Sequence, residues 1–219
     1  MPEGDPLDTI ANAVRTESVV KASRFVADLV PVADLEDAEA VIAEVRREFH
    51  DARHHCTALV VGDDGGRQRS SDDAEPSGTA GAPMLAVLRG ARLTDVVAVV
   101  SRWFGGTLLG TGGLTRAYGG AVGDAVAAAS RVRRRRMERV ALRVGHEAAG
   151  RLEHRLRTWA DLTGGADVAA GVYGPTGAVF EVATLPEHRD ALHQLLAELG
   201  IPYDLEDLGT EVRRLPVEP

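Results

Sequence analysis

The pattern of apolar and polar positions along the first 71 residues predicts a β-hairpin, a helix and two further strands, in that order. β-branched residues dominate 18–32 and are interrupted by Lys21–Arg24, which is typical of a β-hairpin. After Asp34, which suits a helix N-cap, apolar residues recur every three or four positions, so we expect a helix over 35–49. The remaining elements expected here are two strands and the turn between them, over 54–62, 67–71 and 63–66.

The centre of the chain predicts a short helix, a buried strand and a long helix. Pro83 opens an apolar run and suits the first turn of a helix, which we expect over 83–89. Val96–Val100 is almost entirely apolar, which indicates a strand buried on both faces of its sheet. Glycine and alanine are frequent over 114–129, where a helix is expected to pack closely against that sheet.

A new pattern begins at residue 137, with strands and helices in the order β-α-β-β-α-β. This order is the split β-α-β arrangement of ferredoxin-like domains. The expected strands and helices are 137–145, 147–162, 166–173, 178–185, 186–199 and 203–213. The predicted fold class is therefore α+β. The chain divides into a lead-in, an N-terminal domain, a basic junction, a C-terminal domain and a tail, over 1–17, 18–130, 131–136, 137–213 and 214–219.

Composition sets the broad class of protein. Hydrophobic residues make up 44% of the chain, enough for a real core, and no apolar run approaches the roughly 18–20 residues that span a membrane. Cys56 is the only cysteine, which excludes an intrachain disulfide and a four-cysteine zinc site. The N-terminus is acidic and lacks the features of a signal peptide, so we expect a cytoplasmic protein.

The net charge of −8 hides a strong asymmetry along the chain. Residues 1–130 sum to −7, residues 131–157 to +7 and residues 158–219 to −8. A compact basic segment on an acidic protein is a candidate contact for RNA phosphates, although such a run is more often a solvated interdomain linker. The candidate nucleic-acid contacts are the arginines of the junction, Arg131, Arg133, Arg134, Arg135 and Arg136.

Two glycine-rich loops, over 70–81 and 104–113, each lead into a helix and suggest one shared ligand site. Helix N-termini favour anions because they carry free N–H groups and about half a positive charge. No Gly-Lys-Ser/Thr of a P-loop is present, and tight turns alone could account for the glycines. The candidate ligand or anion contacts are Asp72, Asp73, Glu75, Ser77, Gly78, Thr79, Gly81, Arg102, Gly105, Gly106, Gly112, Gly113 and Arg116.

The acidic loop raises an electrostatic objection to anion binding. Asp72, Asp73 and Glu75 carry three negative charges, which outweigh two helix ends. Three arrangements would remove the objection: the carboxylates point away, they pair with arginines such as Arg102 and Arg116, or a divalent cation bridges them to an anion.

The sequence His54-His55-Cys56 does not predict a catalytic centre. In a strand, neighbouring side chains point to opposite faces, so an adjacent Cys–His pair cannot form easily. A lone cysteine at a strand start is usually a small buried residue, and no spaced zinc motif is present. We therefore predict no catalytic residue, no metal and no cofactor.

Residues 70–83 and 101–118 closely resemble the signature of the YigZ/IMPACT family. The likeness covers about 18–130, and the C-terminal half is similar to the small domain that follows in bacterial members. The resemblance implies an N-terminal domain like the second domain of a small-subunit ribosomal protein. It implies a C-terminal domain like those at the end of elongation factor G. Two positions depart from the family pattern: Ala74 stands in place of a usual glycine and Trp103 in place of a usual tyrosine.

The resemblance also implies a function. Eukaryotic IMPACT relatives regulate translation by blocking activation of an amino-acid-starvation kinase, through an additional domain that we do not find in this sequence. The favoured hypothesis is a non-enzymatic, translation-associated factor that binds RNA, the ribosome or a phosphate-bearing ligand through its loop face. The alternatives are an enzyme acting on a small anionic substrate and a regulator that binds only protein partners.

Overall fold

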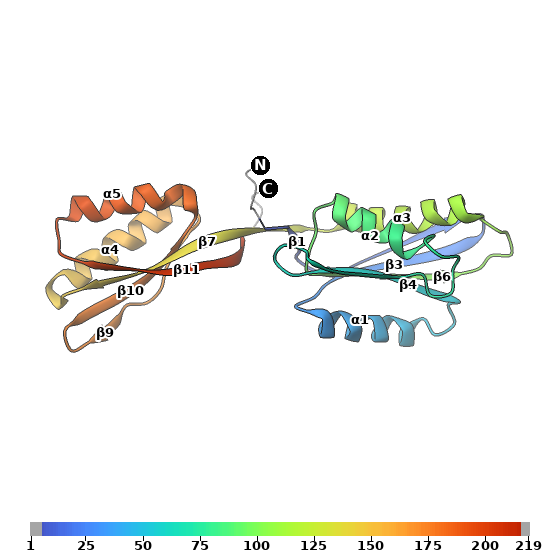
Figure 1. Ribbon diagram of the computed structural model, residues 1–219, viewed down its shortest axis with the longest axis horizontal. Helices are drawn as coiled ribbons and strands as arrows, with labels where there is room; N and C mark the ends of the chain where they lie inside the picture. Colours follow the sequence, from blue (N-terminus) through green and yellow to red (C-terminus); the bar gives the residue numbers. More distant parts are fainter. Residues whose placement is uncertain (1–5, 216–219) are drawn as a thin grey trace. The chain divides into compact units, whose positions relative to one another are not determined.

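The computed structural model describes residues 6–215, which form two compact units (Figure 1). The N-terminal unit covers 6–133 and the C-terminal unit covers 134–215. The ends of the predicted lead-in and tail, residues 1–5 and 216–219, lie outside the described residues. The division falls within strand β7 (Arg131–Val144), so the arginine run is part of a strand and not a loop between domains.

The N-terminal unit is built on a five-stranded antiparallel sheet. Its strands in spatial order are β2 (Val14–Val20), β3 (Ser23–Pro31), β6 (Val96–Trp103), β4 (His54–Val61) and β5 (Arg67–Ser71). The predicted hairpin is confirmed. Its turn uses Lys21 and Ala22 at φ of 45° and 66°, the positive values that suit the twist of a two-residue hairpin.

Helices cover both faces of this sheet (Figure 1). Helix α1 (Leu35–Glu48) confirms the predicted spacing, and the Asp34 carboxylate caps it by accepting the N–H of Asp37 at 2.9 Å. It encloses one apolar core against the sheet, and helices α2 (Gly81–Gly90) and α3 (Thr111–Ala128) enclose another. The central strand β6 contributes to both cores, which confirms its burial on both faces.

Helices α2 and α3 begin before the predicted residues 83 and 114, so those starts were wrong. The first four N–H groups of any helix lack partners within it. A proline or glycine in the first turn therefore destabilises a helix less than one in the interior does. Pro83 and Gly112 both lie in the first turn of their helices.

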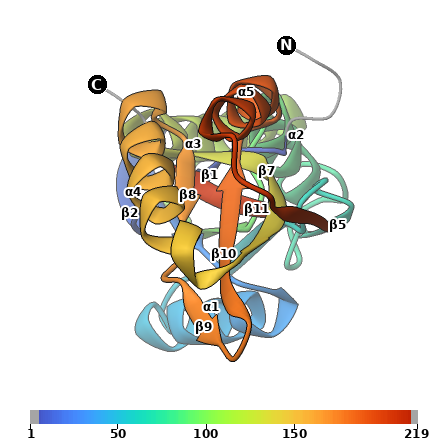
Figure 2. The ribbon, with the colours of Figure 1, turned by 90° about the vertical axis from the view of Figure 1, so that its left-hand side faces the viewer.

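The C-terminal unit follows the predicted element order, except that one predicted strand is divided into two. It consists of β7, α4 (His146–Thr163), β8 (Ala166–Val168), β9 (Val172–Gly174), β10 (Gly177–Thr184), a 3₁₀ turn (Pro186–His188), α5 (Arg189–Leu199) and β11 (Asp204–Leu215). The strands lie in the order β11–β7–β10–β8, and β9 also pairs with β10. Helices α4 and α5 lie side by side over the strands and share one apolar core with them (Figure 2).

The predicted strand over 166–173 is interrupted, with β8 and β9 separated by Ala169–Gly171. A Cβ at Gly171 would lie 2.4 Å from the ring of Phe180, so the chain passes close over this aromatic side chain. In addition, a short strand β1 (Thr9–Ile10), which the polar pattern did not predict, pairs with the start of β7. Within residues 6–215, no helix has the length and apolar character needed to cross a membrane.

Candidate ligand site between two loops

The two glycine-rich loops of the N-terminal unit line one cavity of about 430 Å³. The acidic loop contributes Ala74, Glu75 and Pro76, and the second loop contributes Phe104 and Leu108–Thr111. The ends of the neighbouring strands β4 and β6 supply further lining, which consists of Arg53, His54 and Arg102. The cavity lies where α3 begins, because Gly110 is its N-cap and Thr111 its first residue.

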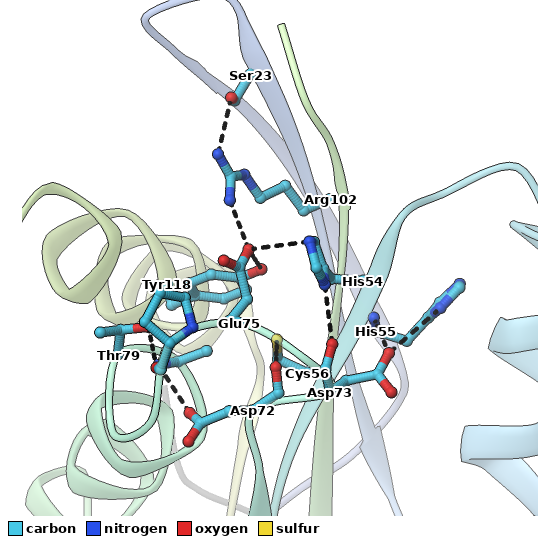
Figure 3. A network of polar contacts seen from close by, with 12 residues as sticks. Ser23, His54, His55, Cys56, Asp72, Asp73, Glu75, Thr79, Arg102 and Tyr118 are labelled. Atoms are coloured by element: carbon cyan, nitrogen blue, oxygen red, sulfur yellow. Dashed lines mark hydrogen bonds and ion pairs between the residues drawn. The ribbon is translucent and has the colours of Figure 1, made fainter. Parts of the chain in front are cut away.

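A buried ion pair joins the acidic loop to strand β6 (Figure 3). Glu75 Oε1 accepts from Arg102 Nη1 at 2.5 Å and from the Tyr118 hydroxyl at 2.8 Å. The side chains of Glu75 and Arg102 are only 4% and 6% exposed. Arg102 Nη2 also donates to Ser23 Oγ at 3.3 Å, and His54 Nε2 lies 3.8 Å from Glu75 Oε1. This polar network links the loop to β3, β4, β6 and α3.

Asp72 is occupied by backbone donors at the start of α2. Its carboxylate accepts the N–H groups of Gly78, Ala80 and Gly81 at 2.7, 3.0 and 2.8 Å. Burial acts to raise the pKa of Asp72, but these three hydrogen bonds lower it below its ordinary value. Gly81 is required here because a Cβ would lie 2.8 Å from the backbone nitrogen of Ser71.

Asp73 is held on the other side of the loop (Figure 3). It accepts the backbone N–H of His55 at 2.6 Å and the Arg46 guanidinium at 2.9 Å. Burial acts to raise the pKa of Asp73, yet the His55 N–H and Arg46 bring it below its ordinary value. The Asp73 carbonyl lies 2.8 Å from Nδ1 of His54, which orients that imidazole at the cavity wall.

The three carboxylates of the acidic loop are therefore all paired inside the protein. Glu75 and Asp73 have arginine partners, of which Arg46 was not foreseen, and Asp72 has a helix N-terminus. Within residues 6–215, no group of three or more His, Cys, Asp or Glu side chains is placed to hold a metal ion. The electrostatic objection to an anion is much reduced, because the negative charges are already balanced.

The second loop leaves positive groups at the cavity. A Cβ at Gly105 would lie 2.0 Å from the carbonyl oxygen of Ala22, so only glycine allows this loop to pass the β2–β3 turn. Helix α3 has no capping side chain and no acidic residue in its first turn, which includes Gly112 and Gly113. Arg116, one turn into α3, is exposed and makes no ion pair within the described residues.

Other candidate residues of the loops have local roles. Thr79 is buried and donates to the Pro76 carbonyl at 2.6 Å, which closes the turn before α2. Gly78 and Gly106 have φ of +76° and +88°, a backbone conformation that favours glycine. Ser77 is exposed on the acidic loop.

The histidine and cysteine side chains separate as strand alternation requires. Cys56 is fully buried, its thiol donates to the Asp72 carbonyl at 3.0 Å, and burial raises its pKa to about 12. A thiol that stays protonated at neutral pH is a poor nucleophile. Burial lowers the pKa of His55, whose Nε2 lies 3.1 Å from the Phe49 carbonyl. Sequence reasoning missed the placement of His54 at the cavity, although alternation in β4 puts it on one face with Cys56.

Several members of the arginine run of β7 are buried or contact other parts of the protein. Arg134 is buried, 6% exposed, and is therefore not presented to solvent. Arg131 donates to the Ala91 carbonyl at 3.1 Å, and Arg135 pairs with Glu187 at 2.6 Å. Three members of the run have exposed side chains and make no ion pair within the described residues: Arg131, Arg133 and Arg136.

The fold brings part of the basic segment next to acidic residues that lie far away in the sequence. Further along β7, Arg139 pairs with Glu181 of β10 at 2.8 Å and Arg143 with Glu206 of β11 at 2.6 Å. Helix α4 adds Arg155, which lies 3.6 Å from Glu198 of α5. The basic segment thus meets acidic residues from the last third of the chain, and the predicted basic patch is balanced in part.

Comparison with known proteins gives the following matches. Residues 21–126 match the Impact N-terminal domain. The chain is 40% identical to "IMPACT family member YvyE" of Bacillus subtilis over 149 residues, 68% of this chain and 69% of that protein. It is 51% identical to "IMPACT family member YigZ" of Escherichia coli over 109 residues, 49% of this chain and 53% of that protein. A crystal structure of a hypothetical protein is 32% identical, covers 98% of each chain and has a TM-score of 0.59.

Proposed function

Since the chain belongs to the IMPACT family, we propose that it is a translation-associated factor whose loop cavity binds the phosphate groups of RNA. The translational role comes from the family, and the matched segment covers 69% and 53% of the two bacterial relatives. The choice of cavity comes from the arrangement of charges in the N-terminal unit.

One observation carries the choice of site: every carboxylate of the acidic loop is paired internally, whereas the N-terminus of α3 at the same cavity is uncapped. Arg53 lines the cavity with an exposed side chain, and Arg116 follows within the first two turns of α3. Free N–H groups and arginine side chains are the usual partners of phosphate in proteins.

The loop cavity supports this role better than the arginine run does. Arg135, Arg139 and Arg143 already have acidic partners with which an added phosphate would compete. Arg134 is buried, so only part of the basic segment is open to phosphate. The enzyme alternative has little support at the cavity, because the carboxylates offered as bases are held by backbone or arginine donors. If the experiments below detect no binding to RNA, a purely protein-binding role is the alternative.

Two further assignments belong to the same proposal. The β11–β7–β10–β8 sheet supports the ferredoxin-like, elongation factor G-like assignment of the C-terminal unit. The five-stranded sheet with α1 on one face and two helices on the other supports the ribosomal-protein-like assignment of the N-terminal unit. We also propose that the protein is cytoplasmic.

The proposal is tested by co-sedimentation of the purified protein with ribosomes, and by RNA titrations, across a salt series. Binding should weaken as salt rises, because each phosphate contact releases counterions. The Arg53→Ala/Arg116→Ala variant should bind more weakly, and its log–log salt slope should fall by about 1 for each arginine–phosphate pair that the substitutions remove.

The matched control is Arg47→Ala/Arg89→Ala, which removes two exposed arginines that lie on α1 and at the far end of α2. This variant changes the net charge equally but leaves the cavity intact. Equal weakening of binding in both double variants would place the contact elsewhere. Absence of binding at low salt would refute the proposed function.

A further inference from the structure

The lining of the loop cavity combines two kinds of side chain. The polar ones are Arg53, His54, Glu75, Arg102 and Thr111, and the charge of Glu75 is balanced by Arg102. The apolar wall consists of Phe104, Leu108 and further leucines of the second loop and of α3, together with Ala74 and Pro76. Its volume of about 430 Å³ lies within the range of about 300–1,000 Å³ that is usual for small-ligand sites. A site that binds only phosphate would not need this apolar wall.

Phe104 is the aromatic part of this wall. Its neighbour Trp103 packs edge-on against Phe49 at 5.4 Å between ring centroids and lies beneath Arg24. Phe104 instead remains 40% exposed at the cavity, so it is not a core residue. The close approach of Gly105 to Ala22 fixes the backbone beside it, and the Arg102 guanidinium lies 5.8 Å from its ring centroid. The backbone that carries the ring is therefore constrained before any ligand arrives.

Arg102 adds an observation that is independent of the helix end. The residue is 5% exposed and lines the cavity, and its Nε–H has no hydrogen-bond partner within the described residues. A buried donor without a partner costs free energy. The Nε atom is itself buried, so a ligand acceptor would reach it after a small shift of the side chain and would then remove that cost.

We propose that the cavity binds one unpaired nucleotide, with its phosphate near Arg53 and the start of α3 and its base stacked on Phe104. This inference rests on the proposed function and names the ligand class of the same site. Every nucleobase has a π face, so stacking on Phe104 should accept any base. The phosphate contact adds no preference for one base over another. The cavity should therefore bind single-stranded RNA or a free nucleotide with little base preference.

Two other occupants fit the site less well. The bases of a duplex are stacked on each other, so a paired strand could offer only phosphate to the cavity and would leave Phe104 uncovered. An apolar peptide could cover Phe104 and Leu108, and its backbone carbonyls could accept hydrogen bonds, but it carries no negative charge to pair with Arg53. A nucleotide offers both an apolar aromatic base and a negative charge.

The test uses calorimetric titration of the full chain with three ligands: inorganic phosphate, ribose 5-phosphate and adenosine 5′-monophosphate. If the base stacks on Phe104, adenosine monophosphate should bind about 5- to 140-fold more tightly than ribose 5-phosphate. Phe104→Ala should abolish this difference and leave the affinity for ribose 5-phosphate unchanged. Phe104→Leu, which keeps an apolar side chain, should lose most of the difference too. Tyr173→Ala is the matched control, since it removes an aromatic side chain that is 57% exposed in the C-terminal unit.

A second series separates free nucleotide from RNA by comparing a short adenosine oligonucleotide with the same strand annealed to its complement. Tighter binding of the single strand than of the duplex, dependent on Phe104, supports the inference. Equal affinities for adenosine monophosphate and ribose 5-phosphate would overturn it while the proposed phosphate binding stands. If neither these ligands nor ribosomal RNA bind, both proposals fail, and a protein partner becomes the better explanation of Leu108, which is 82% exposed at the cavity.

Discussion

Removal of either partner of the Glu75–Arg102 ion pair should strongly destabilise the N-terminal unit. Both side chains are at least nine-tenths buried, and Glu75 Oε1 accepts two hydrogen bonds, from Arg102 at 2.5 Å and Tyr118 at 2.8 Å. Glu75→Leu would leave the Arg102 charge buried without a counter-charge, which typically costs about 3–5 kcal/mol. That loss is a large part of the roughly 5–15 kcal/mol that stabilises a typical domain.

The double variant Glu75→Leu/Arg102→Met sharpens the prediction. Replacing both members by apolar residues of similar size removes the uncompensated charge, and such replacements are often neutral or stabilising. The double variant should therefore be more stable than either single variant. The exposed pair Glu17–Arg24, whose side chains are about half exposed, is the control. Glu17→Ala should cost no more than about 1 kcal/mol.

Urea unfolding followed by tryptophan fluorescence measures these effects. The chain has two tryptophans, Trp103 in the N-terminal unit and Trp159 in the C-terminal unit. A Trp159→Phe background leaves Trp103 as the reporter of the unit under study. With a slope of about 2 kcal/mol per molar urea, a loss of 3–5 kcal/mol lowers the midpoint by about 1.5–2.5 M. Losses below about 1 kcal/mol in the single variants, or losses that add in the double variant, would refute the reasoning.

The acidic loop and the strand beside it support three further predictions. The lowered pKa of Asp72 means that its contribution to stability is present above an unfolded-state pKa of about 3.9 and is lost as the pH falls below it. Asp72→Ala should therefore lower the free energy of unfolding by about 0.5–2 kcal/mol at pH 7 and by much less near pH 2, and equal losses at both pH values would contradict this. Cys56, with a pKa of about 12, should resist a thiol-reactive dye at pH 8 in the native protein but react rapidly in urea; fast native labelling would show that the thiol is accessible. Ala74 has φ of 65°, so Ala74→Gly should raise the urea midpoint by the equivalent of about 1 kcal/mol, and a lower midpoint would show that this conformation is not strained.

Local patterns in the sequence predicted much of the secondary structure. The spacing after Asp34 identifies α1 because its apolar face and its cap lie within one segment. The continuous apolar run in β6 likewise reports burial on two faces, since strand side chains alternate. The start of α3 was harder to predict from the sequence, because glycines in a first turn are also typical of loops.

The partners of the charged residues could not be predicted in the same way. Asp73 pairs with Arg46, which lies 27 positions earlier in the chain, and Arg143 pairs with Glu206, which lies 63 positions later. Such pairs depend on which elements the fold brings together and leave no local pattern. A shared cavity was expected from two similar loops, whereas the placement of His54 and Phe104 in its lining depends on how those loops meet the sheet.

The place of β7 in its sheet has a consequence for folding during synthesis. The strands and helices of the N-terminal unit are all present once residue 133 has left the ribosome, so this unit can form early. Strand β7, in contrast, pairs with β10 and β11, which are translated only after residue 176. Until they emerge, the cationic strand lacks its acidic partners beside the highly negative surface of ribosomal RNA. A nascent chain stalled before residue 177 should therefore carry a folded first unit and an unpaired basic segment.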